Sequence, residues 1–331
     1  MAAGWPGLAA ELPCHSVDVR DAPAVQRVFA AERPEVVFHL AAQPLVRRSY
    51  REPVETFAAN VMGTVHVLEA ARTAPSVLGV VVITSDKCYE NREWHWGYRE
   101  TDAVGGFDPY SASKGCAELV AASYRRSYAA DGTGRVATAR AGNVIGGGDW
   151  AEDRLVPDIL RSVLADEPVR LRRPDAIRPW QHVLEPLSGY LALAARLCQV
   201  GGRFADGWNF GPSEPRPLTV KEVADRLVQL AGRGRVVVDS DSSALHEAHY
   251  LRLDSSKAAA ELGWVPLLST DDRLAWTLDW FSAWRADPAS VWRVTGEQIT
   301  DYERRISQCP QLARWWCPGS PGSSAGHSHA A

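Results

Sequence analysis

The chain has 331 residues and a formal net charge of −4, and 46% of its residues are hydrophobic. This length allows a large core and roughly two domains, and the small negative charge gives no reason to expect nucleic acid or an anionic membrane as a partner. No apolar run is long enough to span a bilayer, and residues 1–12 lack the basic start and apolar stretch of a signal peptide.

Strand and helix patterns alternate through the first half of the chain. We expect a short strand at 15–19, a helix at 22–32, a buried strand at 36–40 and a helix at 53–73, then a strand at 77–84, a helix from about 109 and a strand at 136–141. Segment 77–84 is apolar throughout, as parallel strands tend to be. The alternation predicts a Rossmann-like, doubly wound parallel α/β sheet.

The pattern changes near Gly142. Residues 146–149 read Gly-Gly-Gly-Asp, which we interpret as a mobile loop rather than a phosphate cradle, because no strand directly precedes it and no clear helix follows. A capping box from Thr219 to Glu222 predicts a helix start, a short helix at 255–262 stops at Gly263, and 270–284 is an amphipathic helix. We expect a truncated NAD-binding domain over 1–141, a mainly substrate-binding domain over 142–316 and a disordered tail over 317–331.

The six cysteines show no Cys-x-x-Cys spacing; they are Cys14, Cys88, Cys116, Cys198, Cys309 and Cys317. This favours reduced thiols of a cytoplasmic protein over a disulfide framework or a zinc site. His327 and His329 lie in the tail, and nothing in the sequence supports a metal site.

Two short motifs carry the chemistry: Thr-Ser-Asp-Lys at 84–87, and Tyr-x-x-x-Lys at 110–114. Asp108 and the proline after it predict the start of a helix, which places Tyr110 and Lys114 one turn apart on one face. An ammonium beside a phenol lowers the pKa of the phenol, so Tyr110 is a candidate base. The hydroxyl of Ser85 could orient a substrate alcohol opposite it. This is the chemistry of alcohol oxidation by a nicotinamide.

A Tyr-x-x-x-Lys pair alone is a weak signal, because such pairs also occur on solvated helix faces. Two features strengthen it here. The pair follows a hydrophobic strand that ends in Thr-Ser-Asp, and the chain otherwise uses arginine almost exclusively. Its four lysines are Lys87, Lys114, Lys221 and Lys257, so both motifs kept a compact ammonium whose pKa can move.

Several longer strings resemble the sugar-nucleotide 4,6-dehydratases of the extended short-chain dehydrogenase/reductase family, and most closely the branch that acts on CDP-glucose. The similarity runs from about residue 18 to about residue 284. The strings are Val-Phe-His-Leu-Ala-Ala-Gln-Pro at 37–44, residues 84–89, Asn-Arg-Glu-Trp at 91–94, residues 108–114, Ala-Gly-Asn-Val-Ile-Gly-Gly-Gly-Asp-Trp at 141–150 and Ile-Arg-Pro-Trp-Gln-His-Val at 177–183.

The resemblance implies a hydro-lyase that converts CDP-glucose to CDP-4-keto-6-deoxyglucose with NAD as a recycled cofactor. Tyr110, helped by Lys114 and Ser85, takes the proton of the sugar 4-hydroxyl, and Asp86 is the acid that protonates the departing C6 hydroxyl, which requires a raised pKa. Where the family commonly has glutamate as the C5 base, this chain has Lys87. Lys87 is either that base or one half of a structural ion pair with Asp86 or Glu100.

Further roles are carried over by position. The resemblance assigns cofactor contacts to Asp18, Val19, Leu40, Ala41, Ala42, Tyr110, Lys114 and Val144, and substrate contacts to Gln43, Asn143, Arg154, Arg178, Asn209 and Tyr250. Arginine suits a diphosphate because its fork bonds two oxygens, although Arg154 and Arg178 could be ordinary surface charges. The family also implies a homodimer formed through helices at about 53–73 and 110–128.

The family begins with strand, Gly-x-x-Gly-x-x-Gly, helix and strand, and the sequence from Met1 shows no such segment. We expect about 50 residues of the first nucleotide-binding half to be missing, which opens a gap between the strands at 15–19 and 36–40 and predicts weak or absent NAD binding. Either the start is mis-assigned or the gene is a fragment, or the chain is a short non-catalytic relic or interaction protein. A nucleotide-sugar epimerase is a further alternative, but it needs no acid for a departing water.

Overall fold

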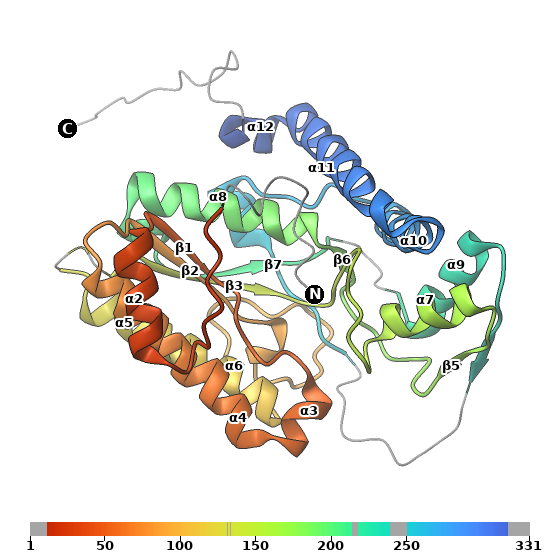
Figure 1. The fold of residues 1–331 in the computed structure, drawn as a ribbon, viewed down its shortest axis with the longest axis horizontal. Coiled ribbons are helices and arrows are strands. Elements are labelled where there is room, and N and C mark those ends of the chain that lie inside the picture. Colours follow the sequence, from red (N-terminus) through yellow and green to blue (C-terminus); the bar gives the residue numbers. More distant parts are fainter. Residues whose placement is uncertain (1–11, 131, 133, 214–217, 239–249, 317–331) are drawn as a thin grey trace.

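The computed structural model describes residues 12–130, 132, 134–213, 218–238 and 250–316 (Figure 1). The tail expected to be disordered lies outside these residues. The described helices include none that is long and apolar enough to cross a membrane. The cysteines at 14, 88, 116, 198 and 309 are free thiols.

The first half of the chain alternates helices and strands as the sequence predicts. Its elements are α2 (Ala22–Glu32), β1 (Val36–His39), α3 (Val46–Arg51), α4 (Pro53–Phe57), the π-helical turn η1 (Ala58–Met62), α5 (Gly63–Thr73), β2 (Gly79–Ile83), the 3₁₀ turn η2 (Asp86–Cys88), α6 (Pro109–Ser127) and β3 (Val136–Ala141). The helix expected at 53–73 is therefore α4, η1 and α5 in succession.

The second half returns to the sheet and adds a smaller group of elements. They are β4 (Val144–Ile145), α7 (Leu155–Ala165), β5 (Val169–Leu171), β6 (Gln181–His182), α8 (Leu184–Val200), η3 (Gly202–Phe204), β7 (Gly207–Phe210), α9 (Val220–Ala231), β8 (Val236–Val238), η4 (Ala258–Leu262), α10 (Thr270–Ala286), η5 (Pro288–Ser290), α11 (Val291–Gln308) and α12 (Pro310–Trp316). The capping box at Thr219 is present, and Gly263 ends η4 in the left-handed conformation.

The main sheet has four parallel strands in the order β1-β2-β3-β7, which confirms the parallel α/β class. Helices cover both faces, α5 and α6 on one side and α8 on the other (Figure 1). Alternate residues of β2 point to opposite faces, so Val80 and Val82 pack with α5 and α6 while Val81 packs under α8. The carboxyl ends of these parallel strands therefore share one edge.

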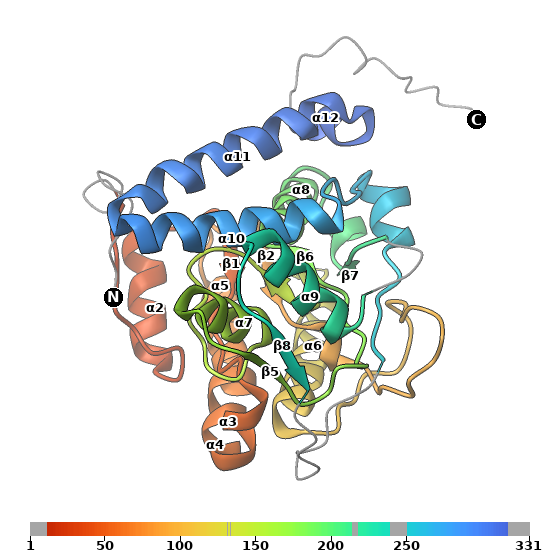
Figure 2. The same ribbon diagram turned by 90° about the vertical axis from the view of Figure 1, so that its right-hand side faces the viewer.

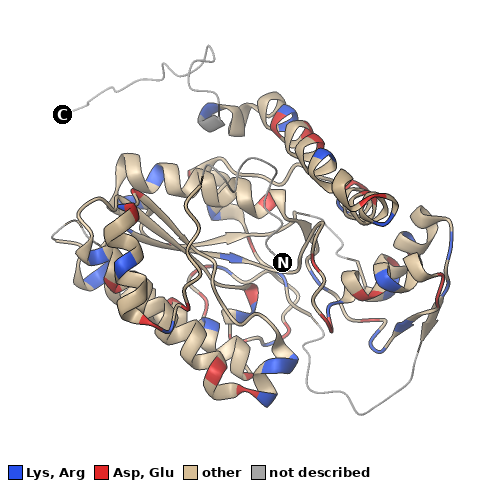
Figure 3. Cartoon of the chain, viewed as in Figure 1, with Lys and Arg blue, Asp and Glu red and all other residues tan. Residues whose placement is uncertain are grey.

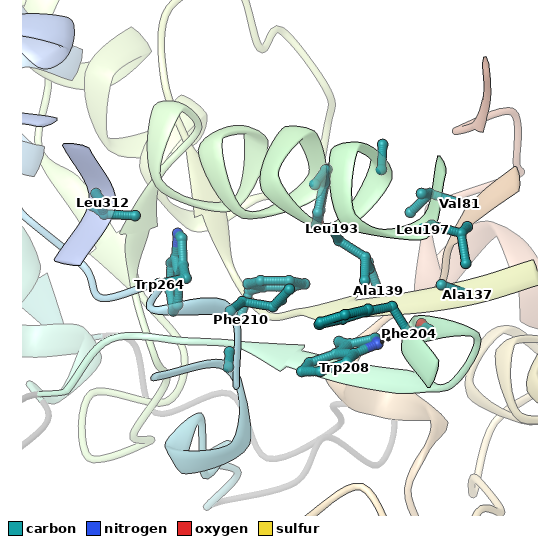
Figure 4. Close-up of a cluster of buried hydrophobic side chains, with 14 of the residues drawn as sticks. Val81, Ala137, Ala139, Leu193, Leu197, Phe204, Trp208, Phe210, Trp264 and Leu312 are labelled. Atoms are coloured by element: carbon teal, nitrogen blue, oxygen red, sulfur yellow. Dashed lines mark hydrogen bonds between the residues drawn. The ribbon is translucent and has the colours of Figure 1, made fainter. Parts of the chain in front are cut away.

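The largest buried cluster lies between the sheet and α8. Leu193 and Leu197 of α8 face Ala137 and Ala139 of β3, and aromatic rings fill the space beside them (Figure 4). The fully buried rings are Phe210, Trp208 and Trp264. Burial of such side chains contributes about 1.5–3 kcal/mol each, so this layer holds β3 rigidly against α8.

The smaller group of elements forms a second core. Helices α7, α9 and α10 pack around the parallel pairs β4–β6 and β5–β8 (Figure 2). The Gly-Gly-Gly-Asp loop enters this core, because a Cβ on Gly147 would lie 2.1 Å from the ring of Trp280. The loop interpreted as mobile is therefore packed tightly against α10.

The strand expected at 15–19 is not formed. Residues 12–18 carry no ladder hydrogen bonds, and the outer edge of β1 has no neighbouring strand among the described residues. The segment instead packs on α5, where the Val19 carbonyl lies 2.9 Å from Nδ1 of His66 and the Val19 side chain approaches Gly63. A β pattern needs a hydrogen-bonding partner, and this segment has a helix beside it.

Candidate active site

The carboxyl end of β2 leads directly into the Thr-Ser-Asp-Lys motif. Ser85 caps the turn η2, because its Oγ accepts a hydrogen bond from the amide of Lys87 at 3.2 Å. The same hydroxyl donates to Oδ1 of Asp86 at 3.0 Å. A strand end followed by a capped turn fixes both side chains at the sheet edge where open α/β folds bind ligands.

Asp86 is a buried carboxyl with an unused oxygen. Its side chain is 2% exposed and its Oδ2 has no hydrogen-bond partner within the described chain. Burial raises the pKa of Asp86, against the lowering effects of Lys87, of the Ser85 hydroxyl and of Arg178. A carboxyl whose pKa is raised by burial is suited to act as an acid.

The position of the Asp86 carboxyl depends on Gly142, which lies opposite it. A Cβ placed on Gly142 would lie 2.1 Å from Oδ2 of Asp86 and 2.6 Å from its carboxyl carbon. Any larger residue at this position at the end of β3 must therefore displace the carboxyl group.

Tyr110 begins α6, as the sequence predicts. Asp108 caps the helix by accepting from the amide of Ser111 at 2.9 Å, with proline at the first position. Tyr110 is buried, and burial raises its pKa to about 12, although the Ser85 hydroxyl and the positive charge of Arg154 act to lower it. The phenol, the Ser85 hydroxyl and the Asp86 carboxyl are thus in one cluster.

Lys114 lies one turn further along α6, but its ammonium donates to the carbonyl oxygen of Ile83 at 3.0 Å. Burial lowers the pKa of Lys114 to about 8, while Glu118 acts to raise it. The lowering of the Tyr110 pKa that we expect from Lys114 therefore does not decide the direction of its shift in the protein by itself. The strand-end carbonyl holds the ammonium, and burial is the largest effect on the phenol.

A cavity of about 1050 Å³ opens at this edge. Of the residues predicted to contact cofactor or substrate, those that line it are Ser85, Asp86, Lys87, Tyr110, Asn143, Val144, Arg154 and Arg178. Asn143 sits where β3 passes to β4, in a left-handed conformation with φ 41°. Arg154 precedes α7 and binds Asp149 at 2.8 Å. The structure therefore brings eight predicted residues from distant parts of the chain to one space.

The rest of this cavity is rich in arginine that the sequence argument did not single out. These arginines come from α3 and from α7, β5 and the loop after it, and they are Arg47, Arg48, Arg51, Arg161, Arg170, Arg172 and Arg173. Figure 3 shows positive charge on both α3 and β5. The pair Arg47–Asp153 bridges the two sides at 3.5 Å. The signal available in the sequence was the Val-Arg-Arg-Ser-Tyr-Arg run of α3, which follows the resembling string at 37–44.

Besides Lys114, five predicted cofactor residues lie outside this cavity. Leu40, Ala41 and Ala42 follow β1, and the Leu40 side chain is 55% exposed. Asp18 forms an exposed ion pair with Arg20, and hydrogen bonds from Arg20 lower the pKa of Asp18 to about 2. Val19, the fifth, contacts α5 as described above.

Three predicted substrate residues also lie outside it. Gln43 bonds Leu45 and Thr56, and its backbone is held by Asn60. The side chain of Asn209 is fully buried between Tyr89, Tyr98 and Asp254. The Tyr250 hydroxyl donates to the carbonyl of His95, and Tyr250 pairs with Ile177, next to Arg178. None of these three side chains lines the cavity.

Tyr190 is a cavity residue that sequence reasoning missed. It comes from α8, is buried, and lines the cavity. Burial raises its pKa, and the negative charges of ionised Tyr110 and Asp86 add to the effect. A tyrosine in the middle of an apolar helix looks like a core residue, so nothing local marks it.

Comparison with known proteins gives matches over most of the chain. The family model described as GDP-mannose 4,6 dehydratase matches residues 5–276. A CDP-glucose 4,6-dehydratase of Salmonella typhimurium is 52% identical over 295 residues, which cover 87% of this chain and 81% of the relative. A dTDP-glucose 4,6-dehydratase of Streptomyces antibioticus is 31% identical over 270 residues, covering 81% of this chain and 76% of the relative.

Solved structures show the same fold. DesIV, a dTDP-glucose 4,6-dehydratase of Streptomyces venezuelae solved with NAD and TYD bound, superposes with a TM-score of 0.68 at 26% identity, covering 84% of this chain and 81% of that chain. A UDP-glucose 4-epimerase of Thermus thermophilus in complex with NAD gives a TM-score of 0.70 at 27% identity, covering 82% and 85%.

Proposed function

The chain belongs to the GDP-mannose 4,6-dehydratase family, and from that premise we propose that it is a CDP-glucose 4,6-dehydratase, a hydro-lyase. The observation that carries the proposal is the buried Asp86 carboxyl, which lines one cavity together with Ser85 and Tyr110. Oxidation and reduction at C4 alone, as in an epimerase, need a base but no acid for a departing water. A carboxyl whose pKa is raised by burial supplies that acid.

The residues divide the reaction between them. Tyr110 accepts the proton of the sugar 4-hydroxyl, and Ser85 orients that hydroxyl by hydrogen bonding. NAD, when bound, supplies a reversible acceptor for the C4 hydride, which is later returned to C6, so the net change is loss of water. The ketone at C4 acidifies the C5 proton, a base removes it, and Asp86 protonates the C6 oxygen as the C–O bond breaks. When the hydride is returned to C6, the same base gives its proton back to C5, which restores the saturated C5–C6 bond.

Lys87 is our candidate for the C5 base. It lines the same cavity, and its positive charge acts on Asp86. The ion pairs within the described chain include none between Lys87 and either Asp86 or Glu100. The Glu100 carboxylate accepts instead from the amide of Asn209. The base role is therefore supported by two observations: Lys87 lines the cavity, and it forms neither of the ion pairs that the sequence left open.

The carboxyl ends of β1 and β2 suit a nicotinamide cofactor. Ala41 and Ala42 are small residues directly after β1, where a dinucleotide backbone can approach closely, and Lys114 stands behind Tyr110. We assign the cofactor to Asp18, Val19, Leu40, Ala41, Ala42 and Val144 together with Tyr110 and Lys114. Residues 1–11 are outside the described structure.

The arginine-rich part of the cavity suits the diphosphate of a nucleotide sugar. Arg154 and Arg178 lie near Tyr110 and Asp86, since their charges lower the pKa values of those two groups. Guanidinium forks bind phosphate oxygens in pairs. Residues 142–316 then form mainly the substrate-binding domain and residues 1–141 the cofactor domain, with β7 returning to the sheet.

We propose a homodimer through α4, η1, α5 and α6. Large apolar side chains are exposed there, Val54 at 76% and Leu119 at 59%, with Met62 and Phe57 between them. Pairing these helices across a two-fold axis would give a four-helix bundle and cover the patch.

The direct test is incubation of the protein with NAD⁺ and CDP-glucose, followed by mass analysis of the nucleotide product. We expect loss of one water from CDP-glucose and slower loss from dTDP-glucose, UDP-glucose or GDP-mannose. No dehydrated product from any of the four substrates contradicts the proposal, and preference for another base contradicts the substrate assignment.

A further inference from the structure

A buried ion pair lies directly behind the proposed site. Glu118 is on α6, one turn beyond Lys114, and Arg140 is on β3. The guanidinium Nη2 donates to Oε2 of Glu118 at 2.7 Å, and the two side chains are 5% and 6% exposed. Removing two charges from water is costly, so a buried ion pair is weak evidence for stability alone, and we looked for a second role.

The Glu118 carboxylate also binds the catalytic strand end. The hydroxyl of Thr84 donates to Oε1, and that of Thr138 donates to Oε2 at 2.7 Å. Thr84 immediately precedes Ser85 and Asp86 in the chain. Through this one carboxylate, α6 is joined to the residues that lead into η2.

Glu118 lies one turn after Lys114 on α6, and its carboxylate binds Thr84, the residue next to the Ile83 whose carbonyl holds the Lys114 ammonium. The Lys114 ammonium donates to the Ile83 carbonyl, and the titratable groups that act on it or feel it are Glu118 on α6, Cys88 on η2 and His39 on β1. Burial disfavours the charged lysine, and Glu118 is the largest influence in its favour.

We propose that Glu118 is a positioning residue, whose carboxylate is the counter-charge of the Lys114 ammonium and ties the strand end carrying Ser85 and Asp86 to the helix carrying Tyr110. Arg140 and the two threonines keep that carboxylate ionised, since burial alone would raise its pKa and their charge and hydrogen bonds hold it below its ordinary value. The catalytic consequence rests on the proposed function, but the charge coupling does not.

The chain offers an unusually clean readout, because it has only four lysines. Protein labelled with ¹³C at the lysine ε-carbon gives four signals, and the Lys114→Arg variant identifies the one that belongs to Lys114. We expect Glu118→Gln to lower the pKa of Lys114 by about one unit or more, as loss of an opposite charge one helical turn away does. A Lys114 titration unchanged by Glu118→Gln overturns the proposal.

Two matched variants separate charge from packing. Thr138→Val removes a hydrogen bond to the same carboxylate without changing any charge, and Glu118→Asp keeps the charge on a shorter side chain. We expect both to leave the Lys114 titration close to that of the parent protein. If the pKa of Lys114 falls in Thr138→Val or in Glu118→Asp by as much as it falls in Glu118→Gln, the effect comes from packing and not from charge. That result overturns the proposal.

If Glu118→Gln does not fold because Arg140 is left unpaired, the double variant Glu118→Gln/Arg140→Met removes both charges. We still expect a lower pKa of Lys114 in the double variant, because Glu118 is the main group that stabilises the charged lysine and Arg140 pairs with Glu118. An unchanged pKa of Lys114 in the double variant overturns the proposal.

In turnover, the alkaline limb of the plot of kcat/KM against pH should move to lower pH in Glu118→Gln and stay in place in Thr138→Val. An unmoved limb in Glu118→Gln contradicts the catalytic consequence of the proposal. Absence of dehydration by the parent protein refutes the proposed function and leaves the lysine titration as the decisive test of Glu118.

Discussion

Replacing Asp86 by asparagine separates the acid from the fold around it. The amide has the same shape, so it fits beside Gly142 and can still accept from the Ser85 hydroxyl. It cannot deliver a proton to the C6 oxygen. Loss of a positioned general acid lowers turnover by about 10²–10⁴-fold, which corresponds to about 3–5 kcal/mol of barrier.

The same variant should not lose stability. The pKa of Asp86 is raised in the folded state, so its favourable contribution is complete below the unfolded pKa of about 4 and is lost as pH rises through the folded value. An amide does not ionise and avoids that loss. We expect the free energy of unfolding at pH 7 to stay within about 1 kcal/mol of the parent or to increase.

The assay is single-turnover reaction with CDP-glucose, following dehydrated product by mass and reduced nicotinamide by absorbance. Oxidation at C4 should still occur in Asp86→Asn, so reduced nicotinamide should accumulate while product does not. Asp279→Asn makes the same chemical change on α10, away from the cavity, and should turn over normally. Dehydration at the parent rate by Asp86→Asn, or its unfolding, refutes the reasoning.

Lys87→Ala should block dehydration yet permit partial reduction of bound NAD⁺; full turnover, measured by product mass, removes Lys87 as the base. Gly142→Ala should reduce turnover at least about 100-fold by displacing Asp86, and cost about 1–3 kcal/mol in urea unfolding, whereas Gly202→Ala, where a Cβ meets nothing within 4 Å, should change neither. Burial lowers the pKa of His39 to about 4, so its share of stability, up to about 3 kcal/mol, should be lost as pH falls from 6.5 to 4. His39→Gln should flatten that part of the stability profile in urea titrations, and an unchanged acid slope contradicts the assignment.

Much of the fold could be predicted because its signals are local. Asp108 and the proline after it predict the start of α6, and the capping box at Thr219 predicts the start of α9. The apolar run before Thr84 predicts a buried strand, and its Thr-Ser-Asp end predicts where the site lies. Each signal depends on neighbours within a few residues, which a sequence displays directly.

The remaining features depend on contacts between distant residues. Lys114 donates to the Ile83 carbonyl because β2 passes beneath α6, and no spacing within the Tyr-x-x-x-Lys pair shows this. Asn209 is bound inside the protein because two loops close around it. The strand expected at 15–19 fails for the same reason, since pairing depends on which element lies alongside.

The central claim is that C4 oxidation, loss of water from C5 and C6, and return of the hydrogen taken from C4 to the sugar all occur in one cavity. CDP-glucose carrying deuterium at C4 tests it most directly. We predict a dehydrated product with the deuterium at C6, detected by mass and by NMR. Deuterium that remains at C4, or that is absent from C6 in a dehydrated product, contradicts the account.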